Sequence, residues 1–335
     1  MEEKNADQKK VLFWDIFCDD FRVNCLSWKH SGKNPVMPPE GTSWKKNWTA
    51  NPDYIEFAGK KLIYYRGNGV SPKDTQHNHD RIAVAEMLEI DDDSIVCRDL
   101  NEANYVIDVG DPGEFDDRDV LDPAAVEFEG KVFLYYSAIG NGPDSVGLAV
   151  SEDGIHFEKK GNVLRGRAPD VVVKDGMIQM IYQLEGDKGY GGGYRGFYLA
   201  QSPDGVHFTQ VFSTPVFNAS ESNNWDCQIA TARLFQQGEH YYMLYGGNPS
   251  KVDQPDYFGL ARSTDLVHWE RHPGNPIFGC GAKGAEDGGA IWFPALIETQ
   301  AQYVMLYEGA RGDYNWSHPS QICLSSIKKE TCGGK

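Results

Sequence analysis

The chain has 335 residues, with 32 Lys and Arg against 49 Asp and Glu, which gives a net charge of −17. This excess of acid argues against a nucleic-acid partner, because such proteins need clustered Lys and Arg. No apolar run approaches the ~18 residues that span a bilayer, so no membrane partner is expected either. The seven Cys residues lack CxxC or Cys/His spacing, and we predict buried thiols, no metal and no cofactor.

The N-terminal region is predicted to have two parts. Residues 1–10, MEEKNADQKK, form a flexible lead without a charged-then-apolar export signal, so the chain as written is cytoplasmic. If an export signal has been removed, a periplasmic or extracellular location is the alternative. The segment VLFWDIF at 11–17 is predicted to be a strand before the first blade that completes the sheet of the last one; an ordinary edge strand is the alternative.

A repeated phrase indicates the fold. A turn and then a strand that closes on Tyr recur at intervals of about 45 to 70 residues, the length of a four-stranded propeller blade with variable loops. A further strand follows each copy, and three of these lead into a matching turn and a fourth strand, at 151–157, 202–208 and 263–269. We therefore predict an all-β, five-bladed β-propeller in one catalytic domain over 11–330. The closing residues are Tyr65, Tyr136, Tyr182, Tyr245 and Tyr307.

The innermost strands of these blades are expected to begin at related positions. Four of the five carry Pro there, where a strand-initial Pro loses no ladder hydrogen bond. Blades converge on a central axis, so the loops that enter the innermost strands should deliver side chains to one pocket. The predicted starts are Asn51-Pro52, Asp122-Pro123, Ala168-Pro169, Ala230 and Phe293-Pro294.

Acidic residues lie at every one of these entrances. Hydrolysis of a glycosidic bond needs one carboxylic acid to protonate the leaving oxygen and one carboxylate to activate water or attack directly. Asp122 is the strongest candidate, although an Asp before Pro also caps turns. Each of the other candidates has a structural alternative as a cap or loop residue: Asp53, Asp170, Asp226, and Glu286 beside Asp287.

Other side chains at the same rim could bind substrate. Arg66 directly follows the first repeated Tyr, and Arg167 lies three residues before Asp170. Trp225 could stack on a sugar ring, because sugar sites use flat aromatic faces. His79 could donate hydrogen bonds, although a polar loop residue is the plainer interpretation. His77 and His79 share a strand face without an evident third ligand, so zinc is not predicted.

The Tyr repeats, the phrases AVSEDGIHF and AQSPDGVHF, and the opening NPVMPPEGTSW before NPDYIEFAGKKLIYYRG resemble the five-bladed propeller glycoside hydrolases, in particular families 43, 117 and 130. The resemblance covers about 280 residues. It implies an acid before Pro in blade two, which is Asp122 here. The family 43 triad is not intact, because the blade-one slot is Asn51 and the blade-three slot holds Arg167-Ala168. The family 117 pattern would fit Asp53, Asp226 and Glu286 by order alone.

The sequence thus predicts an exo-acting, inverting glycoside hydrolase whose partner is an oligosaccharide. Asp53 is expected to be the base, Asp122 an orienting or pKa-setting acid, and Glu286 the general acid, with Asp226 as the substitute for any of them. The binding residues are Arg66, Arg167, Asp170, Trp225 and His79. A family 130-like phosphorylase and a non-catalytic sugar-binding propeller are the alternatives, and no carboxylate cluster indicates an ion on the axis.

Overall fold

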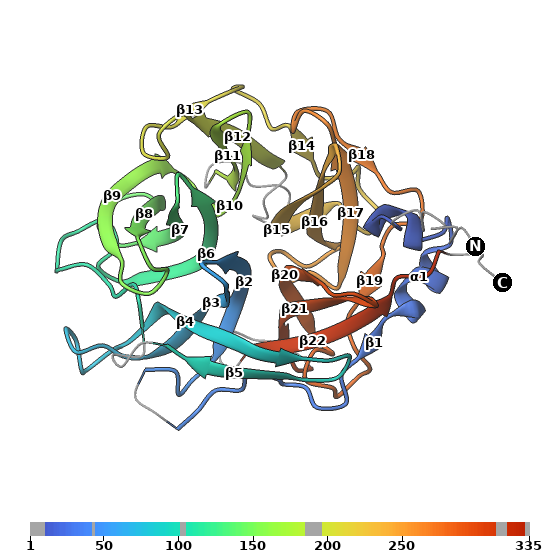
Figure 1. Ribbon diagram of the computed structural model, residues 1–335, viewed down its shortest axis with the longest axis horizontal. Coiled ribbons are helices and arrows are strands. Elements are labelled where there is room, and N and C mark those ends of the chain that lie inside the picture. The colour runs from blue at the N-terminus through green and yellow to red at the C-terminus, as the bar shows by residue number, and fades with distance from the viewer. Residues whose placement is uncertain (1–10, 42–43, 101–104, 185–195, 313–319, 332–335) are drawn as a thin grey trace, which may run out of the picture.

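The computed structural model describes residues 11–41, 44–100, 105–184, 196–312 and 320–331. The predicted N-terminal lead lies outside these ranges. Five antiparallel sheets surround a central axis, which confirms the predicted five-bladed β-propeller (Figure 1). No helix in the described ranges is long and apolar enough to cross a membrane.

Each blade is a sheet whose strands follow one another from the axis outward. Blade one contains β2 (Thr49–Phe57), β3 (Lys60–Val70), β4 (Asn78–Ile90) and β5 (Ile95–Asp99). Blade two contains β6 (Asp119–Phe128), β7 (Lys131–Ile139), β8 (Ser145–Ser151) and β9 (Glu158–Arg165). Blade three contains β10 (Arg167–Lys174), β11 (Met177–Gln183), β12 (Gly196–Ser202), β13 (Thr209–Gln210) and β14 (Phe217–Asn218).

The last two blades follow the same order. Blade four contains β15 (Gln228–Gln237), β16 (His240–Asn248), β17 (Tyr257–Ser263), β18 (Glu270–Arg271) and β19 (Phe278–Gly279). Blade five contains β20 (Ala290–Glu298), β21 (Gln302–Ala310) and β22 (Ser320–Lys328), and its outermost strand is β1 (Lys29–His30) from the N-terminal region.

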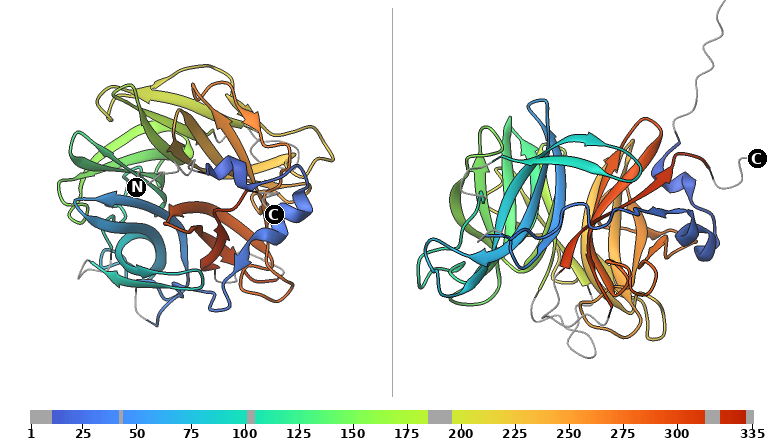
Figure 2. Two further views of the ribbon diagram at one scale, coloured as in Figure 1. Left: turned by 45° about the vertical axis from the view of Figure 1, so that its right-hand side comes forward. Right: turned by 90° about the horizontal axis from the view of Figure 1, so that it is seen from below.

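The predicted strand at 11–17 is wrong, although a strand from the N-terminal region does complete the last blade. Phe13–Ile16 forms the 3-10 helix η1, and Phe21–Ser27 forms the short helix α1. Phe13 packs among aromatic side chains of blades four and five, and its N–H donates to the Gln237 side chain at 2.8 Å. The segment is therefore fixed by side-chain packing, whereas ring closure uses β1, which pairs with β22 (Figure 2).

The repeated Tyr residues explain why the blades hold together. All five are 0% exposed and sit in the second strand of their blade. A buried hydroxyl needs a hydrogen-bond partner. In blades two, four and five an aspartate from the loop before the innermost strand accepts the hydroxyl of the repeated Tyr, and the pairs are Tyr136 with Asp116, Tyr245 with Asp226, and Tyr307 with Asp287.

Every innermost strand is interrupted by a β-bulge at the same place. The bulge residue has a positive φ of between 44° and 54° in each of the five strands. A bulge takes one residue out of the ladder and re-aims its side chain. Four of the bulge residues precede Pro, which fits because Pro has no N–H to donate to the ladder. The bulge residues are Asn51, Asp122, Ala168, Thr231 and Phe293.

Candidate functional site

Two positions in each blade approach the axis near the end where the innermost strands begin. The first is the bulge residue, and the second is the residue that directly follows the repeated Tyr in the second strand. In blades one and two both positions, and in blade five the second position, carry polar or charged side chains. Asn51 and Arg66 contact Glu308, and Ser137 contacts Asp122. We name them the entrance cluster: Asn51, Arg66, Asp122, Ser137 and Glu308.

Glu308 on β21 joins blade five to blade one. The Asn51 side chain donates to Glu308 Oε2 at 2.7 Å, and Arg66 Nη2 lies 3.3 Å from Glu308 Oε1. Glu308 is 3% exposed. Burial raises the pKa of this carboxyl, the Arg66 charge opposes the rise, and the nearby charge of Asp122 adds to it. A second carboxylate therefore lies close enough to Glu308 for the two charges to interact.

Asp122 is held by a chain of hydrogen bonds from blade three. The Ala168 N–H donates to Ser137 Oγ at 2.7 Å, and Ser137 Oγ donates to Asp122 Oδ2 at 2.7 Å. Asp122 is only 2% exposed. Ser137 pairs with Leu121 in the ladder, and the bulge at Asp122 turns its carboxylate toward the face of the sheet that carries the Ser137 side chain.

Within the described ranges, several buried polar atoms of this region have no hydrogen-bond partner. They include the side-chain oxygen of Asn51 and the side-chain nitrogen of Gln183, which follows the repeated Tyr of blade three. Beside them lies a small apolar cluster that includes Ala168, Trp292 and Phe293. Unpaired donors and acceptors next to aromatic side chains suit a ligand with hydroxyl groups and an apolar face, as a sugar has.

A second charged group lies further along the axis. Arg233 extends from blade four, donates through Nη1 to Asp170 at 2.9 Å, and donates through Nη2 to the carbonyl oxygens of Pro52 and Pro123 at 2.9 Å. Asp53 Oδ1 lies 3.7 Å from Arg233 Nε. We name Asp53, Asp170 and Arg233 the deep cluster, since both acids lie two residues beyond a bulge residue.

Burial dominates the electrostatics of the deep cluster. It raises the pKa of Asp170 to about 7 against the opposing charge of Arg233, and the charge of Asp53 adds to the rise. Burial also raises the pKa of Asp53. Each acid accepts a backbone N–H from the neighbouring blade, Asp53 from Ala125 at 2.6 Å and Asp170 from Leu234. These contacts connect blades one, two, three and four, so the deep cluster stabilises the ring.

Three other sequence-predicted residues lie within blades four and five. Asp226 accepts the Tyr245 hydroxyl at 3.1 Å and pairs with Arg271 at 3.2 Å, and Trp225 packs against Tyr245 with ring centroids 5.5 Å apart. Glu286 accepts a hydrogen bond from the Gln321 side chain. The structure thus separates these residues from the contacts of the entrance cluster.

The remaining predicted cations lie at different places. Arg66 belongs to the entrance cluster, and Arg167 at the start of β10 lies 3.9 Å from Asp253. Arg311 pairs with Glu286 at 3.1 Å.

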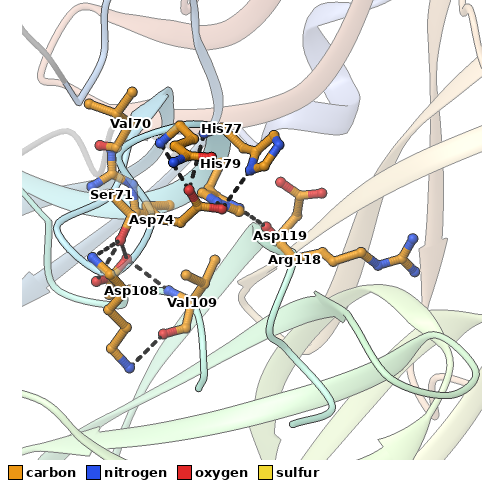
Figure 3. Close-up of polar contacts among 12 residues, drawn as sticks. Val70, Ser71, Asp74, His77, His79, Asp108, Val109, Arg118 and Asp119 are labelled. Atoms are coloured by element: carbon orange, nitrogen blue, oxygen red, sulfur yellow. Dashed lines mark hydrogen bonds and ion pairs between the residues drawn. The ribbon is translucent and has the colours of Figure 1, made fainter. Parts of the chain in front are cut away.

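His79 lines a cavity of ≈ 440 Å³ between blades one and two. The cavity lies between the β3–β4 connection and the segment that leads into β6 (Figure 3). His79 Nδ1 is 2.5 Å from the Arg118 carbonyl oxygen, and Nε2 is 3.4 Å from Asp74. Within the described ranges, no group of three or more His, Cys, Asp or Glu side chains is placed to hold a metal ion.

Glu308 was missed in the sequence, although a signal for it was present. Arg66 was predicted because it directly follows the repeated Tyr of blade one. The same position in blade five, after Tyr307, is Glu308. Applying one register to all five copies would have found it.

The comparisons with known proteins bear on the fold. No family model and no curated protein matches the chain. Among solved structures, a glycosyl hydrolase from Bacteroides ovatus has a TM-score of 0.66 at 16% identity over 91% of this chain and 94% of that one. The β-1,2-mannobiose phosphorylase from Listeria innocua, in complex with β-1,2-mannobiose, has a TM-score of 0.67 at 14% identity over 90% and 97%.

A third similar structure comes from work on the GH130 family of mannoside phosphorylases, which contains glycoside hydrolases that target β-1,2-mannosidic linkages in Candida mannan. Its TM-score is 0.65 at 18% identity, over 91% of this chain and 95% of that one. At these identities the likeness establishes a shared five-bladed propeller fold. The predicted resemblance to propeller glycoside hydrolases is confirmed at that level.

Proposed function

We propose that the protein is a carbohydrate-active enzyme, and specifically a glycoside hydrolase that acts on an oligosaccharide at the entrance cluster. The observation that supports this most directly is a buried carboxyl group, Asp122, near a second charged site in which Glu308 contacts Asn51 and Arg66 of the next blade. Glycosidic bond cleavage needs paired carboxyl groups, and the enzymes of similar fold act on glycosides.

Within this proposal Asp122 is the carboxylate that activates water. A single side-chain hydroxyl, that of Ser137, orients it, and the residue directly precedes Pro as the family resemblance implies. Glu308, Arg66 and Asn51 bind hydroxyl groups of the sugar, because their donors and acceptors converge on one side of the axis. Trp292 and Phe293 offer an apolar surface to the sugar ring.

We propose an exo-acting, inverting course. Five blades that converge on one axis leave room for the end of a saccharide more readily than for its middle. A single displacement by water requires the two catalytic carboxyl groups to stand about 6.5–9.5 Å apart, so that water fits between them. The anomer of the released sugar, followed by NMR during the first minutes of reaction, tests this course.

The roles predicted for Asp53, Glu286 and Asp226 stay predictions. We do not include them in the proposed mechanism because each is bound to partners of its own: Asp53 in the deep cluster, Glu286 with Gln321 and Arg311, and Asp226 with Tyr245. Substitution of each by its amide, with activity and the free energy of unfolding measured side by side, tests those roles.

A phosphorylase is the second candidate, because one structure of similar fold is a β-1,2-mannobiose phosphorylase. Phosphate would need cations at the site, since charge-assisted hydrogen bonds hold it. In the entrance cluster the only cation is Arg66, which already contacts Glu308 and Asp80. This arrangement favours water over phosphate as the acceptor.

The decisive experiment is product release from a panel of plant, algal and β-1,2-mannoside oligosaccharides, followed by mass spectrometry with and without phosphate. Free monosaccharide without phosphate supports the hydrolase. A sugar phosphate formed only with phosphate supports the phosphorylase. Binding without any product, seen by calorimetry, would leave a sugar-binding propeller.

A further inference from the structure

The cavity between blades one and two contains a carboxyl group that the sequence analysis passed over. Asp119, the first residue of β6, lines this cavity together with His79, Arg118, Lys73 and His77. It is partly buried and lies three residues before Asp122 on the same strand. Asp119 thus lines the cavity and lies on the same strand as Asp122 of the entrance cluster.

We propose that this cavity binds the leaving-group sugar of the oligosaccharide and that Asp119 donates the proton to the glycosidic oxygen. The inference rests on the proposed function and deepens it, because it names the second catalytic carboxyl group and the site for the departing part of the substrate. Asp119 is thus a catalytic residue, and Asp80 beside it is a positioning residue.

Asp119 and Asp122 lie three residues apart on the innermost strand β6, and the bulge between Leu121 and Ala124 follows Asp119. The carboxyl group of Asp119 contacts Asp80 of blade one, and that of Asp122 contacts Ser137 of blade two. Three residues of extended chain span about 10 Å between Cα atoms, so one strand holds the two acids apart, as a single displacement by water requires.

Asp80 fixes the orientation of Asp119. The Asp80 N–H donates to Asp119 Oδ1 at 2.9 Å. The Asp80 carboxylate in turn accepts hydrogen bonds from Trp48 at 2.9 Å and Asn68 at 2.8 Å, and Arg66 lies 3.4 Å from it. Arg66 also contacts Glu308, so one guanidinium connects Asp80, the neighbour of Asp119, to the entrance cluster.

The electrostatic surroundings suit a proton donor. Burial raises the pKa of Asp119, and the charge of Asp80 raises it further. When two neighbouring carboxyl groups have different environments, the one with the raised pKa is the acid of the pair. Trp48, Asn68 and Arg66 surround the Asp80 carboxylate and hold it beside Asp119.

The lining of the cavity suits a neutral sugar. Lys73 is paired with Asp111 at 2.9 Å, and His77 with Asp74 at 2.7 Å, so these two basic side chains already have acidic partners. The cavity volume of ≈ 440 Å³ lies within the range of small-molecule sites. Polar side chains and the short apolar wall of Val109 and Pro112 then contact hydroxyl groups and ring carbons.

The proposed step balances as follows. The Asp119 proton passes to the glycosidic oxygen as the bond from that oxygen to the anomeric carbon breaks, and the bonding electron pair leaves with the oxygen. Water, which gives a proton to Asp122, attacks the anomeric carbon from the opposite face. The products are a free sugar and a saccharide shortened by one unit, and exchange with solvent restores both carboxyl groups.

The test is the Asp119→Asn variant, assayed on two substrates of the sugar that the panel identifies: the natural saccharide and the corresponding glycosyl fluoride. Fluoride leaves without a proton and needs no leaving-group site. We expect kcat/KM for the saccharide to fall by about 100-fold or more, the usual contribution of a general acid, and kcat/KM for the fluoride to change by less than about 3-fold. The alkaline limb of the pH profile for the saccharide should disappear.

Two further variants complete the test. Asp175→Asn, the same change at an exposed turn of blade three, should behave as the wild type. Pro112→Trp, which fills the cavity from an exposed position, should raise KM for the saccharide and leave the fluoride reaction unchanged.

The outcomes separate the two proposals. An inactive wild-type protein would overturn the proposed function, and this inference with it. An active wild type whose Asp119→Asn variant loses both substrates equally, or neither, would overturn this inference alone. The free energy of unfolding of Asp119→Asn identifies a folding defect, and Asp119→Glu then serves as the second variant, which should retain part of the saccharide activity and the alkaline limb.

Discussion

The entrance cluster and the deep cluster are both groups of charged and polar side chains near the propeller axis. They share strand β2, on which Asn51 of the first and Asp53 of the second lie two residues apart. In the deep cluster Arg233 contacts Asp53 and Asp170, and each acid also accepts a backbone N–H of another blade. Arg233 Nε makes no hydrogen bond within the described ranges, but it lies 3.7 Å from the carboxylate of Asp53. In the entrance cluster the side-chain oxygen of Asn51 is buried without a hydrogen-bond partner among the described residues.

The difference shows how one repeated backbone can serve stability and chemistry at once. Buried charges that are paired with opposite charges hold neighbouring blades in place, because removal of one partner leaves the other charge uncompensated. Buried polar atoms without partners cost free energy and are usually explained by a ligand or by water. The deep cluster therefore stabilises the ring, and the entrance cluster is proposed to bind and cleave the substrate.

The strongest way to sharpen this comparison is the Asp122→Asn variant. The amide keeps the size of the side chain and can still accept the Ser137 hydrogen bond, but it cannot take a proton from water. We expect kcat/KM to fall by about 10²–10⁴-fold, with the free energy of unfolding within about 1 kcal/mol of the wild type. Steady-state kinetics and urea unfolding measure the two quantities, and a large loss of stability with retained activity would reverse the assignment.

Arg233→Met should, unlike Asp122→Asn, cause a large loss of stability. The substitution leaves Asp53 and Asp170 buried without their cation, so we expect the free energy of unfolding to fall by about 3–5 kcal/mol. Urea unfolding measures this loss. Adding Asp170→Asn to the same chain should restore part of it, and a double variant that is no more stable than Arg233→Met would contradict the electrostatic explanation.

The pH dependence of stability should depend on the deep cluster. The pKa of Asp170 is raised to about 7 in the folded protein, above its ordinary value of 3.8. The folded state therefore binds more protons, and this contribution to stability is fully present below about pH 4 and is lost as the pH rises toward 7. Unfolding in urea at pH 5 and pH 7.5 measures the loss.

Asp170→Asn should remove most of that dependence between pH 5 and 7.5. Exposed acids such as Asp204 change the stability over a different pH range. The backbone N–H of His207 lowers the pKa of Asp204, so its contribution is lost only when the pH falls below about 4. An unchanged slope in Asp170→Asn would show that other groups control the pH dependence.

Gln183→Leu should produce the smallest change. Among the described residues the Gln183 side-chain nitrogen has no hydrogen-bond partner. Its replacement by an apolar side chain of similar size should therefore leave the free energy of unfolding within about 1 kcal/mol of the wild type. If this nitrogen binds a sugar hydroxyl, KM should rise while stability stays the same. A marked loss of stability would show that Gln183 has a structural role.

The fold was predictable from sequence because the strand with the repeated Tyr occurs once in every blade. The repeated Tyr of the second strand is buried in all five blades, and a two-residue strand period can be followed from it. The N-terminal region lacks a repeat, and there the prediction failed. Nothing in VLFWDIF distinguishes a strand from an irregular segment held by aromatic packing, and β1 has only two residues.

The site was predictable only in part, because charge alone does not show what a side chain contacts. Asp122 was found from its place before Pro. Asp53 and Asp226 look equally suitable in the sequence, and only the structure reveals that Arg233 and Tyr245 contact them. Arg233 itself lies in the strand QIATARLFQQ, where an outward-facing cation would look the same.

The pairing of β1 with β22 has a consequence for how the protein is made. A ribosome synthesises His30 near the start of the chain and its ladder partner Ser325 near the end. Blades one to four can each form as their own strands emerge, but the last sheet must wait for its final strand, and β1 stays without its partner until then. Agents that compete for that waiting segment should therefore act during synthesis and have little effect on the finished ring.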